Sequence, residues 1–133
     1  MKYLIDTQIL LWFQSNDKQL KSSIKNILND TNNQIFVSDV SLYEIAIKLK
    51  INKLPELYAS VEDIIFVANQ DSFQFLPISH NHFLTYDIIP SFSDHKDPFD
   101  KLILATALSE NIPIISADEK FKLYDSIIAL IEA

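Results

Sequence analysis

The feature that most constrains the fold is an alternation of short apolar runs with longer segments of helical period along the whole chain. Strands are predicted over residues 2–6, 34–37, 74–78, 113–116 and 126–130. Helices are predicted to begin near Thr7, Lys18, Asp39, Val61 and Pro98, with shorter ones after His80 and Asp118 and a loop over 86–96. This alternation predicts an α/β fold, and the length of 133 residues without linker or repeat predicts one domain, residues 1–133.

The composition excludes several classes of site. Cysteine is absent, which rules out disulfide frameworks, thiolate zinc sites and cysteine nucleophiles. Glycine is also absent, which rules out the glycine-rich loops that bind nucleotide phosphates. The net charge is −7, so the chain does not hold nucleic acid mainly through a basic surface, although a nuclease that gains positive charge from bound metal remains compatible.

The N-terminal sequence favours a cytoplasmic protein. Asp6 follows the first apolar residues too early for a signal peptide, and no apolar run approaches the roughly 20 residues of a membrane span. We therefore expect a soluble domain without membrane association.

Two acidic residues follow predicted strands. Asp6 ends the first strand, and Asp118 follows the strand 113–116 with the hydroxyl of Ser116 two residues before it. Ligands of open α/β sheets bind beyond the carboxyl ends of strands, so both acids stand where a site is built. The alternative is that each only caps the following helix or turn, because Asp is a preferred N-cap.

Glu44 lies on an apolar stripe of the helix that begins near Asp39. A carboxylate in that position needs a partner, and a functional site is one explanation. Two structural explanations stand beside it. Lys48 follows four residues later in the favourable order for an ion pair, and Ser41 and Glu44 have the spacing of a capping box.

The segment 95–107 carries two further acids. Asp97 has the position of an N-cap, with Pro98 as the first helical residue. Asp100 falls in the first turn and shares a stripe with core-facing apolar residues, so it is predicted to point toward the core side. His95 either contacts a substrate or is a solvated loop residue.

These separate segments all place carboxylates where one site would form. Carboxylates that converge repel one another, and a divalent cation bound through oxygen is the usual resolution. The lysines near these motifs, Lys48, Lys101 and Lys120 among them, are either phosphate contacts or ordinary surface residues.

In order and spacing, four motifs resemble PIN-domain ribonucleases, particularly the VapC-like toxins of bacterial toxin–antitoxin pairs. They are LIDT at 4–7, SLYEIAIK at 41–48, HKDPFDKLILA at 95–105 and SAD at 116–118. The resemblance implies a three-layer α/β/α sandwich around a mainly parallel sheet. It also implies an acidic set that binds Mg²⁺ or Mn²⁺, formed by Asp6, Glu44, Asp100 and Asp118, with Asp118 as an outer or second-metal ligand. Residues that support these ligands or contact substrate would be Asp97, Ser116, Thr7, Lys101 and His95.

The same resemblance implies hydrolysis of RNA phosphodiester bonds, a cognate antitoxin partner and a homodimer. Three positions depart from the family pattern. Lys101 stands where Arg is usual, which weakens bidentate phosphate recognition there, and Asn52 and Asn111 stand where Gly is usual.

Two other functions are compatible with parts of the sequence. The first is a PIN-like module that binds a protein or RNA partner without catalysis, which metal titration would distinguish. The second is a phosphoacceptor signalling domain, which needs an acceptor Asp after its central strand. The strand 74–78 runs instead into Ser79 and His80.

Overall fold

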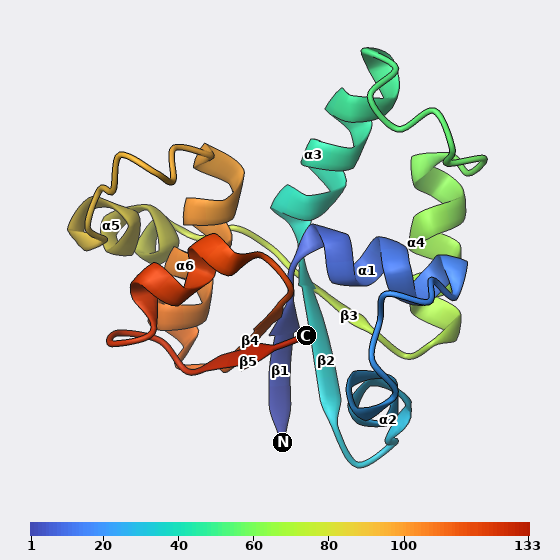
Figure 1. The fold of residues 1–133 in the computed structure, drawn as a ribbon, viewed down its shortest axis with the longest axis horizontal. Coiled ribbons are helices and arrows are strands. Elements are labelled where there is room, and N and C mark those ends of the chain that lie inside the picture. The colour runs from blue at the N-terminus through green and yellow to red at the C-terminus, as the bar shows by residue number, and fades with distance from the viewer.

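The computed structural model describes residues 1–133 and has a five-stranded sheet at its centre (Figure 1). The strands are β1 (Lys2–Ile5), β2 (Gln34–Ser38), β3 (Gln74–Leu76), β4 (Ile114–Ser116) and β5 (Leu130–Glu132). All neighbouring strands are parallel, in the order β3-β2-β1-β4-β5. The chain thus fills one side of β1 first and the other side later, and such a switch leaves a crevice at the carboxyl ends of the central strands.

Helices cover both faces of this sheet. They are α1 (Thr7–Ser15), α2 (Ser22–Asn29), α3 (Asp39–Lys50), α4 (Val61–Gln70), α5 (His80–Ile88), α6 (Pro98–Glu110) and the 3₁₀ helix η1 (Glu119–Tyr124). α1, α2 and α4 lie on one side of the sheet and α5 and α6 on the other (Figure 1). The predicted three-layer α/β/α arrangement around a parallel sheet is confirmed. None of the helices combines the length and the apolarity that crossing a membrane requires.

The two faces of the sheet have separate cores. Along β1, Tyr3 and Ile5 pack with α1, α2 and α4, whereas Leu4 packs with α6 and η1. β4 alternates in the same way, with Ile115 in the first core and Ile114 in the second. Side chains of a strand alternate between its faces, and burial on both faces explains why these strands are apolar throughout.

Asparagine takes over the role of glycine in the turns. Asn111 ends α6 with φ 54°, and Asn52 follows α3 with φ 56°. Both adopt the left-handed conformation, in keeping with their positions where Gly is usual in the family, because Asn tolerates positive φ better than most residues.

Strands β1 to β4 lie within two residues of their predicted positions, but the last strand was predicted wrongly. The strand is Leu130–Glu132 rather than 126–130. The amides of Ile127 and Ile128 instead bond to the carbonyl of Tyr124, at 3.0 and 3.1 Å, and so continue the turn after η1.

Two helix boundaries also differ from the prediction. α2 begins at Ser22 instead of near Lys18, because the Asp17 side chain accepts from the Gln19 amide and forms a turn there. α5 continues to Ile88, which lies inside the predicted loop 86–96. It ends shortly before Pro90, since a residue that precedes proline is disfavoured in helical conformation.

Candidate active site

A cavity of about 380 Å³ opens at the carboxyl ends of β1 and β4. Five acidic side chains line it, and they come from four separate segments of the chain: Asp6, Glu44, Asp97, Asp100 and Asp118. Lys48 is the only basic residue in the wall. A volume of this size lies in the range of small-molecule pockets, so the cavity can hold more than a single ion.

Asp6 caps α1 and is one of the most buried acids of the protein. Its Oδ1 accepts from the Ile9 amide at 2.9 Å, and its Oδ2 accepts from the Ser116 hydroxyl at 2.5 Å. Burial raises the pKa of Asp6 to about 7, and the charges of Asp100 and Asp118 add to this effect, while the two hydrogen bonds oppose it. Asp6 therefore caps α1 and also lines the cavity, so the capping role does not remove it from the candidate site.

Ser116 connects the ends of the two central strands. Its hydroxyl donates to Asp6 and accepts from the Asp118 amide at 3.0 Å. Asp118 is exposed and caps η1 by accepting from the Lys120 amide at 2.9 Å. At the end of β4, the Ser116 hydroxyl therefore contacts the side chain of Asp6 and the backbone amide of Asp118.

Both oxygens of the Glu44 carboxylate are occupied. Oε1 accepts from the Thr7 hydroxyl at 2.7 Å, and Oε2 accepts from the Lys48 ammonium at 2.6 Å. The Thr7 oxygen also lies 2.9 Å from Ser41 Oγ. A hydroxyl has one proton, and an ionised carboxylate can only accept, so Ser41 is the donor in that second contact.

The capping box predicted for Ser41 and Glu44 is wrong. α3 begins three residues earlier than such a box requires, and Ser38 caps it by accepting from the Val40 amide. Ser41 is fully buried inside the helix and contacts Thr7 instead.

The start of α6 brings in two more acids. Asp97 caps the helix by accepting from the amides of Phe99 and Asp100, at 2.9 and 3.3 Å. Asp100 is partly buried, with 19% of its side chain exposed. The pKa of Asp100 is raised to about 6, mainly by burial and also by the charges of Asp97 and Glu44, while its hydrogen bond with His95 opposes the shift.

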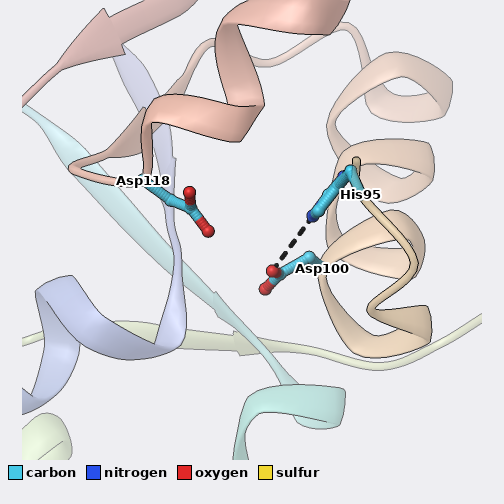
Figure 2. Close-up of side chains that lie close together, drawn as sticks. All are labelled: His95, Asp100 and Asp118. Carbon is cyan, nitrogen blue, oxygen red and sulfur yellow. Dashed lines mark hydrogen bonds and ion pairs between the residues drawn. The ribbon is translucent and has the colours of Figure 1, made fainter. Parts of the chain in front are cut away.

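The donor atoms fit a hard divalent cation. Figure 2 shows the Asp118 and Asp100 carboxylates facing each other, with the His95 ring beside Asp100 and joined to it by a dashed line. One ligand atom from each of these three residues lies within 4.8 Å of the others. Mg²⁺ and Mn²⁺ prefer oxygen ligands. Burial, together with the neighbouring acids, raises the pKa values of Asp6 and Asp100 and so disfavours their charged forms, which a cation in the cavity would stabilise.

Lys48 is the one positively charged side chain in the cavity wall. Burial lowers the pKa of Lys48, but the hydrogen bond and the charge of Glu44 outweigh this effect, so the pKa is raised overall. The ammonium group stays charged at neutral pH. Its side chain is 40% exposed, so it can reach a molecule that enters the cavity.

The PIN domain family matches residues 3–127 of the chain. The chain belongs to this family. The resemblance inferred from the four motifs is therefore confirmed, and the match covers all of them.

Solved structures of similar fold come from VapBC proteins. VapBC2 from Rickettsia felis, bound to a DNA fragment from its promoter, has a TM-score of 0.72 at 16% identity, with 100% of this chain and 99% of that chain covered. VapBC-1 from nontypeable Haemophilus influenzae has a TM-score of 0.68 at 18% identity, over 99% and 98%. VapBC-5 from Mycobacterium tuberculosis, a member of the VapBC family of toxin–antitoxin systems, has a TM-score of 0.61 at 18% identity. The match covers 99% of this chain and 98% of that chain. No curated protein sequence matches the chain.

The PIN domain brings most of the predicted site residues together, but Ser116, Lys101 and His95 lie outside the cavity wall. Ser116 is connected with the cavity through its hydrogen bond to Asp6. Lys101 Nζ bonds to Ser91 Oγ at 3.1 Å and lies 5.7 Å from the centre of the Tyr86 ring. His95 is only 2% exposed. The predicted direct contact of His95 with substrate therefore finds no support in its position.

Some residues of the site were not apparent in the sequence. Tyr124 bonds to His95, and no local pattern links two residues that are 29 positions apart. Leu54 lines the cavity from the loop after α3, where no periodicity applies. Lys48 was recognisable as the partner of Glu44 from its spacing, but nothing in the sequence distinguished it from the other lysines as part of the cavity.

Proposed function

We propose that this chain is a single PIN domain, residues 1–133, that acts as an endoribonuclease and uses Mg²⁺ or Mn²⁺ to hydrolyse RNA phosphodiester bonds. We further propose that it is the toxin of a toxin–antitoxin pair. The observation that carries this proposal is the convergence of five acids from four segments on one cavity. Helix capping accounts for Asp6, Asp97 and Asp118 singly, but it gives no reason for placing five like charges around one cavity.

Asp6, Asp100 and Glu44 are the proposed cation ligands, with Asp118 as an outer or second ligand. When bound, the cation lowers the pKa of a water molecule and offsets charge that develops on the phosphate. Ser116 and Thr7 hold the carboxylates of Asp6 and Glu44 in place. Their hydrogen bonds fix the orientation of the acids before any ligand enters.

Lys48 is the proposed contact for the RNA phosphate. Its ammonium group is paired with Glu44, at 2.6 Å. The Lys48 side chain is 40% exposed in the cavity wall, so its ammonium group can also contact a phosphate that enters the cavity. Lys101 is less suited to this role, because it is bound to Ser91 away from the acids.

An antitoxin partner and a homodimer complete the proposal. The similar structures are VapBC complexes, which supports a protein partner for this PIN domain. The exposed side chains of Phe83, Leu84 and Ile88 on α5 support an interface between two copies. Light scattering coupled to size exclusion tests the dimer, and co-expression with candidate antitoxins tests whether one of them binds the chain and neutralises its effect on cell growth.

The decisive experiment incubates the purified protein with total cellular RNA in Mg²⁺ or Mn²⁺, and then in excess EDTA, and maps the new RNA ends. We expect discrete cuts that appear with the metal and disappear with EDTA. Calorimetric titration with Mn²⁺ runs in parallel. The absence of saturable Mn²⁺ binding would instead indicate a PIN-like binding module without catalysis.

A further inference from the structure

His95 has both ring nitrogens engaged although it is buried behind the cavity wall. Nε2 lies 3.2 Å from Asp100 Oδ2, the contact drawn in Figure 2, and Nδ1 lies 2.7 Å from the Tyr124 hydroxyl. His95 is 2% exposed and Tyr124 is 1% exposed. The imidazole therefore reaches neither solvent nor a bound molecule, and its connection with the site passes through Asp100.

The chemistry of these groups sets the direction of the two hydrogen bonds. An ionised carboxylate can only accept a hydrogen bond, so Nε2 of His95 carries a hydrogen and donates a hydrogen bond to Asp100. In the neutral ring Nδ1 then has only its lone pair, so Tyr124 donates to it. Burial raises the pKa of Tyr124, which keeps the phenol protonated as this role requires. The result is a donor chain from Tyr124 through His95 to Asp100.

Aromatic packing prevents the imidazole from turning away. The His95 and Tyr124 rings pack edge to face with their centres 5.4 Å apart. The centre of the Phe121 ring lies 5.8 Å from the centre of the His95 ring. Phe92 packs against Tyr124 at 5.3 Å, and its carbonyl accepts from the His95 amide at 3.1 Å. The ring orientation is therefore fixed from several sides.

The position of Tyr124 in η1 ties two acids to one helix. Asp118 caps the start of η1, and Tyr124 is the last residue of the same helix. η1 consequently supports Asp118 directly and Asp100 through His95. Displacing Tyr124 would change the separation of two carboxylates that face the same cavity.

The alternative that His95 itself ligates a cation conflicts with this proton arrangement. One of its ring nitrogens lies within 4.8 Å of an oxygen of Asp118 and of Asp100, which is close enough for such a role. However, a nitrogen that donates a proton to Asp100 has no lone pair to offer, and Nδ1 is taken by Tyr124. The geometry thus favours support of a ligand over ligation.

We propose that His95 and Tyr124 are positioning residues that hold one oxygen of Asp100 and leave the other for a divalent cation. This inference rests on the proposed function, whose cation ligands include Asp100. It assigns to the His of the motif at 95–105 a role that does not involve contact with RNA.

The protein offers a matched control for this idea. His82 is 1% exposed, its Nδ1 accepts from the Ser79 amide at 3.1 Å, and its Nε2 lies 2.8 Å from Glu110. It is therefore another buried histidine paired with a carboxylate, but neither member of this pair lines the cavity. A histidine needed only for packing should behave like His82 when substituted.

The test compares Tyr124→Phe, His95→Leu and His95→Gln with the controls Tyr3→Phe and His82→Gln. Mn²⁺ affinity is measured by calorimetry, and cleavage of a defined RNA is measured as kcat and KM. We expect His95→Leu to weaken Mn²⁺ binding by roughly 10- to 100-fold, as found when partners of metal ligands are lost. Tyr124→Phe should weaken it about threefold, and His95→Gln, which keeps an N–H donor, should recover part of the loss.

The cleavage measurements should show a lower kcat at saturating RNA with little change in KM, and the two controls should match the wild type. If His95→Leu does not fold, Tyr124→Phe and His95→Gln carry the test. Wild-type Mn²⁺ affinity in the folded variants would overturn the inference, as would complete loss in both His95 variants with no effect of Tyr124→Phe. Because affinity is measured without RNA, a wild type that binds Mn²⁺ but cuts no RNA would overturn the proposed function alone.

Discussion

Ser116 and Asp6 are 110 residues apart in the sequence, yet a hydrogen bond of 2.5 Å joins their side chains. Asp6 follows β1 and Ser116 ends β4, and the two strands are neighbours in the sheet. The bond therefore joins the carboxyl ends of the two strands and fixes the orientation of a buried acid of the site.

Replacing Ser116 with Ala removes this donor and leaves one oxygen of Asp6 without a partner. We expect the free energy of unfolding to fall by about 1–2 kcal/mol, the usual cost of an unsatisfied buried group. Mn²⁺ affinity should fall about tenfold, because the carboxylate is no longer held. Chemical denaturation and calorimetry measure the two effects. Ser23→Ala, at an exposed position on α2, is the control and should change neither quantity.

The raised pKa of Asp6, about 7, predicts an unusual dependence of stability on pH. Between roughly pH 4 and pH 7 the folded protein keeps a proton that the unfolded chain has released, so stability falls as the pH rises through this window. Asp6→Asn lacks this group. Without metal, its free energy of unfolding relative to the wild type should therefore increase by about 2 kcal/mol from pH 5 to pH 7.5. A difference that stays constant over this range, measured by denaturation in EDTA, would contradict the shifted pKa.

Asp100→Asn nearly preserves volume and removes one charge from the crowded site. We expect cleavage of RNA to fall by at least about 100-fold, since a proposed cation ligand is lost. The fold should persist, and the melting temperature without metal should rise, because repulsion from Asp97 and Glu44 is relieved. Asp87→Asn, an exposed acid on α5, should leave both quantities unchanged. Cleavage at the wild-type rate by Asp100→Asn would remove this residue from the mechanism.

The sequence predicted the elements of the site better than their connections. Asp6, Asp97 and Asp100 were predictable because strand ends and helix caps are local features, and local rules place them. The partnership of His95 with Tyr124 depends on how η1 docks on the sheet, which only tertiary packing determines. The last strand was misplaced for the same reason, because its start is set by pairing with β4 and not by its own apolar run.

The same distinction applies to basic residues. Lys48 and Lys101 look alike in the sequence, and the family pattern drew attention to Lys101. In the fold, α3 turns Lys48 into the acidic cavity, whereas Lys101 bonds to Ser91 beside the ring of Tyr86. The helix face on which each lysine lies therefore determines whether its side chain can contact a substrate in the cavity.

Lys48→Met therefore provides a test of substrate contact, with Lys101→Met as its matched control. Met keeps the apolar stem and removes the charge, so KM for RNA should rise about three- to tenfold, and the dependence of binding on salt should weaken. Mn²⁺ affinity should stay the same or increase, because the ammonium group no longer competes for Glu44. Steady-state kinetics at two salt concentrations and calorimetry make these measurements. If Lys101→Met raises KM more than Lys48→Met does, the assignment of the phosphate contact is wrong.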